Sequence, residues 1–176
     1  YILFFSLIYA QSWYNHTELK WKTFDTEHFI FYYHEGVENT VSEAAFVAEK
    51  IYKPITDYYD FRPKTKTAIV IKDTDDISNG TAFYYDNKLE IWAHPLDFDL
   101  RGSHRWLQNV ITHEFAHIIQ IGSSMKASTI FPAFYIQGFS YENEKRDDVL
   151  YGYPNSMFSI PIPGVAVPPW VAEGTA

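Results

Sequence analysis

Residues 103–122 read SHRWLQNVITHEFAHIIQIG, and the fold of the surrounding chain is organised by this stretch. Its apolar side chains recur at the spacing of one helical face, at Leu107, Val110, Ile111, Phe115, Ile118 and Ile121. Ser103 suits the N-cap position of a helix, and Gly122 suits the position where a helix stops. The spacing therefore predicts a bounded helix with one buried face.

The same helix carries His113-Glu114-Phe115-Ala116-His117, an HExxH motif. Positions i and i+4 of a helix lie on one face, so two imidazoles placed there can bind one Zn²⁺. Glu114 points in a neighbouring direction, from which its carboxylate can reach a water on the metal. Two histidines and a glutamate are costly to bury in so apolar a helix, and one zinc ion would satisfy all three. The motif predicts metal-assisted hydrolysis, most often of a peptide bond, with Glu114 as the catalytic base.

A catalytic zinc site usually has three protein ligands and one position for water, so a third ligand must come from elsewhere. Residues 168–176 read PPWVAEGTA. HExxH followed downstream by W-x-x-E-G-x-A resembles the gluzincin metallopeptidases, and this resemblance assigns the third metal ligand to Glu173. The chain looks most like the peptidase MA-like domain, through the run from His113 to Gln120 and the Pro-x-Trp-x-x-Glu-Gly-x-Ala end. The resemblance implies a zincin-like metallopeptidase N-lobe at the start of an exported bacterial protein, often followed by a TolB-like β-propeller.

Other side chains compete for the third ligand position. Four carboxylates form a charged run that is more typical of an exposed loop or helix face, namely Glu142, Glu144, Asp147 and Asp148. His94 and His104 are within range by sequence but lack ligand spacing to the motif. Glu173 also has a plain alternative, a solvated carboxylate with no ligand role.

Composition narrows the class of protein. The 176 residues are 47% hydrophobic and 20% charged, which indicates a globular domain with a sizeable core. The net charge is −8 and no basic stripe is present, so we expect no nucleic-acid partner. The chain has no Cys, which excludes disulfides and thiolate zinc sites, so any metal must be held by His and carboxylate.

Residues 1–10 read YILFFSLIYA, and we interpret them as the apolar region of a truncated secretory signal peptide that ends at Ala10. The run is too short to span a bilayer as it stands; an uncleaved anchor and a buried first strand are the alternatives. We therefore expect export to the periplasm, cell envelope or medium, with membrane or envelope association left open. Because the third-ligand motif ends the sequence, we expect residues 11–176 to be a metallopeptidase-like domain of a longer protein with a further C-terminal domain.

The remaining pattern predicts an α+β fold, with a small mixed sheet of about four or five strands and packed helices. Alternation predicts strands at 19–25, 28–33, 66–72, 81–85 and 89–93, the first two and the last two forming hairpins. A helical repeat covers 37–58, where Pro54 should kink or end the helix. Residues 123–169 are rich in Pro, Gly and Ser and are expected to be irregular.

By the resemblance, the strand just before the motif helix is an edge strand that takes an extended substrate by β-addition. Either strand of the second hairpin can be that edge, so the candidate substrate-binding residues are Ala82, Phe83, Tyr84, Ile91, Trp92 and Ala93. The expected function is zinc-dependent hydrolysis of a peptide or protein substrate. The alternatives are a catalytically silent cell-envelope binding or scaffold module on a zincin fold, and a hydrolase of non-peptide amides.

Overall fold

The computed structural model of the chain describes residues 16–74, 76–96, 104–124, 133–141, 145, 152, 154–163 and 169–176. The chain divides into two compact units. One comprises Tyr1–Leu19 and Ala133–Ile162, and the other comprises Lys20–Pro132 and Pro163–Ala176. The HExxH motif, Glu173 and the second hairpin all belong to the latter unit, so the site can be described within a single unit.

The central element of this unit is a five-stranded mixed sheet with the order β1-β2-β3-β5-β4. Strands β1 (Trp21–Asp25) and β2 (Phe29–His34) form the first antiparallel hairpin, and β3 (Thr67–Lys72) runs parallel to β2. Strands β4 (Gly80–Phe83) and β5 (Lys88–Trp92) form the second hairpin, and β5 runs parallel to β3. Both predicted hairpins and the predicted α+β class are confirmed.

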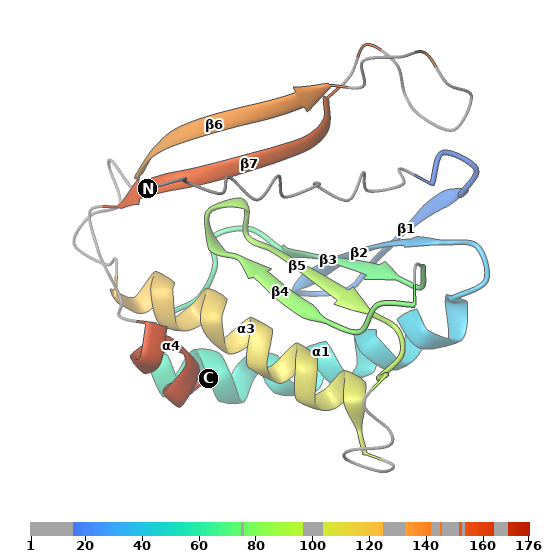
Figure 1. Cartoon of the computed structure of the whole chain (residues 1–176). Helices are drawn as coiled ribbons and strands as arrows, with labels where there is room; N and C mark the ends of the chain where they lie inside the picture. The colour runs from blue at the N-terminus through green and yellow to red at the C-terminus, as the bar shows by residue number, and fades with distance from the viewer. Residues whose placement is uncertain are drawn as a thin grey trace, which may run out of the picture. The chain divides into compact units, whose positions relative to one another are not determined.

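Helices α1 (Glu38–Tyr59) and α3 (Trp106–Ser124) lie side by side on one face of this sheet (Figure 1). Successive side chains of a strand point to opposite faces, so every second residue of the inner strands faces the helices. These positions are apolar and fully buried, at Phe29, Phe31, Ile69, Ile71, Leu89 and Ile91. The core therefore lies between the sheet and the two helices.

Phe115, inside the HExxH motif, anchors the motif helix to this core. Its ring centroid lies 5.2 Å from that of Phe29 in β2 and 5.7 Å from that of Tyr52 in α1. The side chain is completely buried. Because Phe115 faces the core, the flanking residues of the motif are directed around the helix toward the sheet edge and the cavity.

Helix α1 has the expected span and does not end at Pro54, whereas the expected end of α3 is wrong. Helix α1 continues through Pro54 to Tyr59, because Tyr52 and Thr56 are buried on either side of the proline and their packing offsets the lost backbone hydrogen bond. Helix α3 continues through Gly122 to Ser124. A Cβ at Gly122 would lie 2.2 Å from Cε1 of Phe61, so this glycine admits a neighbouring ring and does not end the helix. Ser103, the expected N-cap, lies outside the described residues.

The expectation that residues 123–169 are irregular is wrong for two segments. Strands β6 (Ala133–Tyr141) and β7 (Pro154–Pro163) form a separate two-stranded sheet in the first unit. Proline is tolerated in strands where its missing N–H faces away from a partner, and both strands of a two-stranded sheet have such a free edge. The signal-peptide interpretation of residues 1–10 falls outside the described part and stays a prediction. Among the described helices, none combines the length and apolar character that crossing a membrane requires.

Candidate metal centre

Three ligand atoms from two helices converge in the second unit. His113 Nε2 lies 3.1 Å from His117 Nε2 and 3.3 Å from Glu173 Oε2. His117 Nε2 lies 3.8 Å from the same Glu173 oxygen. Ligand atoms bound at about 2.1 Å around a tetrahedral zinc are about 3.4 Å from one another. The three side chains therefore have the spacing and the donor chemistry of a His₂Glu zinc site.

Helix α3 positions both histidines, and the short helix α4 (Pro169–Thr175) positions the glutamate. The two imidazole rings stand one helical turn apart, with centroids 4.6 Å apart and planes at 82°. Proline at the first position of α4 suits a helix start, because its missing N–H would have no helical partner there. The sequence-predicted residues His113, His117 and Glu173 are thus brought together by the packing of α4 near α3.

The environment of His117 favours the neutral imidazole that a metal requires. Burial lowers the pKa of His117, and repulsion from His113 lowers it further. The negative charge of Glu173 and a hydrogen bond with the Gln120 side chain act in the opposite direction without outweighing them. A neutral ring keeps a lone pair available for metal binding.

Glu114 lies beside the three ligand atoms but does not belong to the group of potential metal ligands. Its side chain is buried, and this burial raises the pKa of Glu114. Nearby His113 and a hydrogen bond from the backbone of Ala82 in β4 act to lower this pKa, and the negative charge of Glu173 acts to raise it. The carboxyl is therefore more basic than an ordinary glutamate and is oriented by the sheet edge.

Strand β4 approaches the motif helix closely at Gly80. A Cβ on this residue would lie 2.3 Å from Val110 Cγ2 and 2.9 Å from both Cγ and Oε1 of Glu114. No larger residue fits there without a shift, so the glycine is required by the contact between strand and helix. Gly80 is also the first residue of β4.

A cavity of about 560 Å³ lies over the convergent ligands. Its lining comes from the sheet edge, from α3 and from α4, with Asn79, Gly80, Thr81, Ala82, His113, Glu114, His117, Ile121, Ala172 and Glu173 as its members. This volume is within the usual range for ligand pockets. Asn79, Gly80, Thr81, Ile121 and Ala172 were not identified as site residues from the sequence, because none of them is a specified position of either motif and only the tertiary packing brings them to the cavity.

The sheet order decides which strand of the second hairpin is the edge. Among the described strands, β4 is terminal, whereas β5 is paired with β3 on one side and β4 on the other. The β5 backbone therefore has no free edge for an added strand, and Ile91, Trp92 and Ala93 are buried away from the cavity lining. Of the candidates in the first strand and its turn, Ala82 lines the cavity, whereas Phe83 and Tyr84 do not.

Neither competing histidine joins the site in the part of the chain that the structure describes. His94 is exposed, and its Nε2 lies 3.7 Å from Asp73 Oδ2. Within the described residues, neither His94 nor His104 belongs to a group with metal-binding spacing. The acidic candidates Glu142, Glu144, Asp147 and Asp148 lie outside the described residues.

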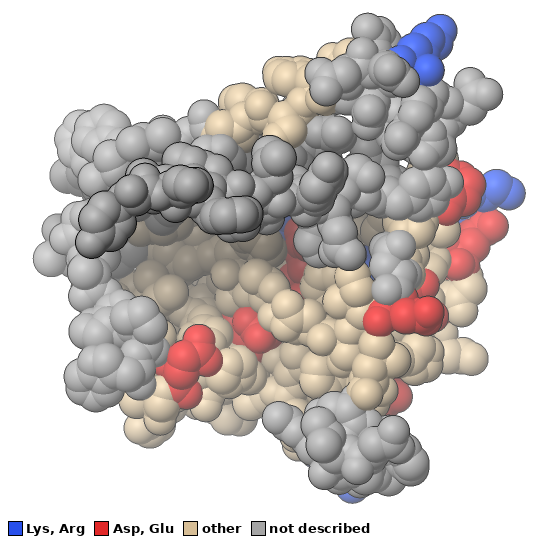
Figure 2. Space-filling model, in the orientation of Figure 1, with Lys and Arg blue, Asp and Glu red and all other residues tan. Residues whose placement is uncertain are grey.

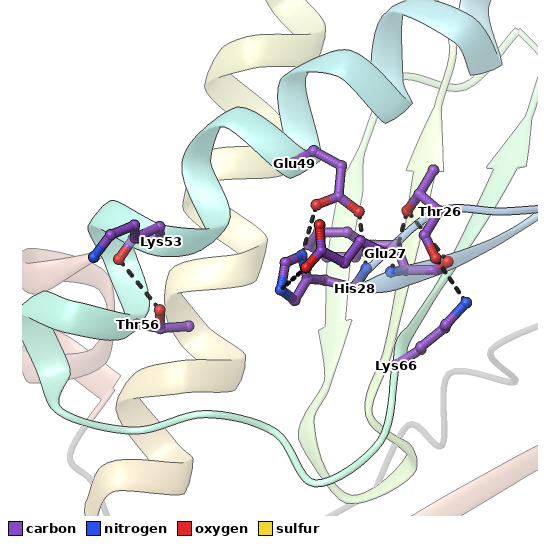
Figure 3. Close-up of polar contacts among 8 residues, drawn as sticks. Thr26, Glu27, His28, Glu49, Lys53, Thr56 and Lys66 are labelled. Carbon is purple, nitrogen blue, oxygen red and sulfur yellow. Dashed lines mark hydrogen bonds and ion pairs between the residues drawn. The ribbon is translucent and has the colours of Figure 1, made fainter.

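A second group of metal-competent side chains, Glu27, His28 and Glu49, joins the first hairpin to α1 (Figure 3). His28 Nδ1 lies 2.7 Å from Glu49 Oε2, and the His28 backbone N–H donates to Glu49 Oε1 at 2.9 Å. Both oxygens of Glu49 therefore already have partners, and Glu27 is exposed at 3.8 Å from His28 Nε2. We interpret this group as a cross-link between strand and helix.

Acidic groups are more prominent than basic groups on the described surface in Figure 2, in agreement with a formal net charge of −8. A negative field favours the approach of cations.

Comparison with known proteins identifies no relative of this chain. No protein-family model and no curated protein matches it.

Proposed function

We propose that this chain is a zinc-dependent metallopeptidase. The observation that carries the proposal is the convergence of His113 Nε2, His117 Nε2 and Glu173 Oε2 within 3.8 Å of one another. Two imidazoles and one carboxylate are a usual ligand set of catalytic zinc and leave one position open. When bound there, Zn²⁺ would polarise the scissile carbonyl and acidify a water molecule.

Glu114 is the proton carrier in this proposal. Its carboxylate accepts a proton from the attacking water and returns it to the leaving amine. The pKa of Glu114, raised by burial, brings its basicity closer to neutral pH, where proton transfer in both directions is efficient. The hydrogen bond from the Ala82 backbone keeps the carboxylate directed along the cavity wall.

The free edge of β4 supports a peptide or protein as the substrate. An extended chain laid along Gly80–Phe83 can pair with this edge through its backbone, which gives affinity for many sequences. Three of these residues, Gly80, Thr81 and Ala82, line the cavity together with Glu114, so a scissile bond held there lies beside Glu114. The HExxH and W-x-x-E-G-x-A motifs resemble those of the gluzincin peptidases, which favours peptides over other amides as substrates. The proposal also includes export of the protein and a further C-terminal domain.

The test combines metal analysis with hydrolysis of a mixed peptide library followed by mass spectrometry. We expect about one zinc per chain, weakened or lost in Glu173→Ala. Glu114→Gln should keep zinc and lose turnover, because it removes the base and leaves the three ligands in place. Glu49→Gln is the matched control, since it alters the second group without touching the first, and it should keep both zinc and activity.

Two results would separate the alternatives. A chain that binds zinc through Glu173 but cleaves no peptide would favour the catalytically silent envelope module. Zinc that is lost in Glu49→Gln and kept in Glu173→Ala would move the metal to the second group and refute the site proposed here.

A further inference from the structure

Gln120 is a buried polar residue on the same helical stripe as the two histidines. Positions i, i+4 and i+7 share one face of a helix, and His113, His117 and Gln120 occupy them in α3. Only 8% of the residue is exposed. A buried amide is costly unless its polar atoms find partners, so the contacts of Gln120 indicate its role.

The Nε2 atom of Gln120 donates to the helix that carries Glu173. Its acceptors are the Val171 carbonyl oxygen at 3.4 Å and the Thr175 hydroxyl. Helix α4 has seven residues, and so short a helix is unstable without tertiary contacts. Val171 and Thr175 flank Glu173, so Gln120 holds α4 on both sides of the third ligand.

Tyr59 of α1 makes a second attachment to the same helix. Its hydroxyl donates to the Thr175 carbonyl oxygen at 2.6 Å, and Ser123 of α3 donates to the Tyr59 carbonyl oxygen at 3.0 Å. Helix α4 is thus tied to both helices of the core. Gln120 differs from Tyr59 in that it also lies beside a metal ligand.

The other polar atom of Gln120, Oε1, is buried and accepts no well-aligned hydrogen bond within the described residues. Gln120 follows His117 by three residues in α3, so the two side chains are neighbours on the surface of the helix. His117 directs Nε2 toward His113 and Glu173, which leaves Nδ1 as the nitrogen for another partner. Metal-binding histidines usually donate this second N–H to a carbonyl or carboxylate oxygen.

We infer that Gln120 is a positioning residue that orients two of the three metal ligands at once. Its Nε2 holds α4 so that Glu173 faces the histidines, and its Oε1, which has no partner among the described residues, would accept the His117 Nδ1–H when the metal is bound. The inference rests on the proposed zinc site. It predicts that metal affinity depends on a residue that does not itself touch the metal.

Zinc affinity, measured by competition with a chromophoric chelator, tests this inference. Gln120→Met keeps the approximate side-chain volume and should weaken zinc binding about 10- to 100-fold, as for other partners of metal ligands. Gln108→Met is the matched control, because Gln108 is an exposed glutamine of the same helix. It should leave the affinity unchanged within about twofold.

A double-mutant cycle separates positioning from general destabilisation. If Gln120 acts through α4, Gln120→Met should weaken zinc binding less in a Glu173→Ala background than in the wild type. The loss of zinc affinity in the double variant should then be smaller, by more than about twofold, than the product of the two single losses. The absorption spectrum of the Co²⁺-substituted protein should also change in Gln120→Met, because the ligand geometry changes. Tyr59→Phe, which removes only the second attachment of α4, should weaken zinc binding in the same direction and serves if Gln120→Met does not fold.

The outcomes distinguish this inference from the proposal beneath it. No zinc in the wild-type protein would refute both. Zinc that is weakened by Glu173→Ala but unchanged by Gln120→Met would refute the role of Gln120 alone. Fully multiplicative losses in the cycle would also overturn it, since the two residues would then act independently.

Discussion

Gly80→Ala is the most direct test of how the sheet edge meets the motif helix. The added Cβ would lie 2.3 Å from Val110 Cγ2, whereas carbon atoms in ordinary contact are at least about 3.5 Å apart. The pair must therefore separate by about 1.2 Å. Val110 is buried and branched at Cβ, so it cannot rotate away cheaply, and the strand or Glu114 must move.

The expected cost follows from this overlap. Overfilling a packed core usually destabilises by about 1–3 kcal/mol, and we expect this loss in urea unfolding of Gly80→Ala. Zinc affinity should stay within about twofold, because Gly80 touches none of the three ligands. Peptide cleavage should fall about 100-fold, since a misplacement of about 1 Å in catalytic geometry has an effect of this size.

Two variants control the interpretation. Gly174→Ala makes the same change beside Glu173, where an added Cβ meets no atom within 4 Å, and it should cost no stability. Gly80→Ala combined with Val110→Ala removes the closest overlap and should recover part of the loss. An unfolding free energy for Gly80→Ala within about 0.5 kcal/mol of wild type would refute the close packing of β4 on α3.

Three further predictions concern the core and its polar cross-link. Gly122→Ala places a Cβ 2.2 Å from Phe61 and should lower the unfolding free energy, measured in urea, by about 1–3 kcal/mol. Combination with Phe61→Leu should restore part of the lost stability. A Gly122→Ala variant as stable as the wild type would contradict the packing of Phe61 against Gly122. Phe115→Ala removes a fully buried ring and should cost about 3–5 kcal/mol, where a loss below about 1 kcal/mol would show that the ring is not in the core. Burial acts to raise the pKa of Glu49, but hydrogen bonds from Thr26 and His28 outweigh burial and lower this pKa from 4.5. The ionised Glu49 therefore stabilises the folded chain above pH 4.5. This stabilisation is lost as the pH falls through the lower pKa that Glu49 has in the folded state. Glu49→Gln should therefore cost about 1 kcal/mol at pH 7 and flatten the stability profile below pH 4.5, and an unchanged profile would show that the carboxylate does not contribute.

The sequence determined the features that depend on neighbouring residues. Helical spacing predicted α3 and placed His113 and His117 on one face, because i and i+4 are adjacent in any helix. Alternation predicted the two hairpins for the same local reason. Glu114 could likewise be assigned beside the ligands, since its direction from the helix axis follows from its position alone.

Local rules failed where a distant residue changed the outcome. Gly122 was expected to end α3, because glycine is common just after helix C-termini. Instead the helix continues to Ser124, and Phe61 occupies the space beside Gly122. Pro54 can kink or end a helix, and α1 continues past it to Tyr59 with buried residues on either side. The prolines of residues 154–163 suggested a loop, but these residues form strand β7 of a two-stranded sheet.

Only the tertiary structure decided which strand is the edge, what lines the cavity and how Glu173 reaches the histidines. Glu173 was assigned by resemblance, yet its distance from His113 depends on how Gln120 and Tyr59 hold α4. The same packing brings Gly80 against Glu114 and leaves β4, with one unpaired side, as the cavity wall. Periodicity specifies which face of an element is buried, whereas the partner of that face is chosen by the packing of the whole chain.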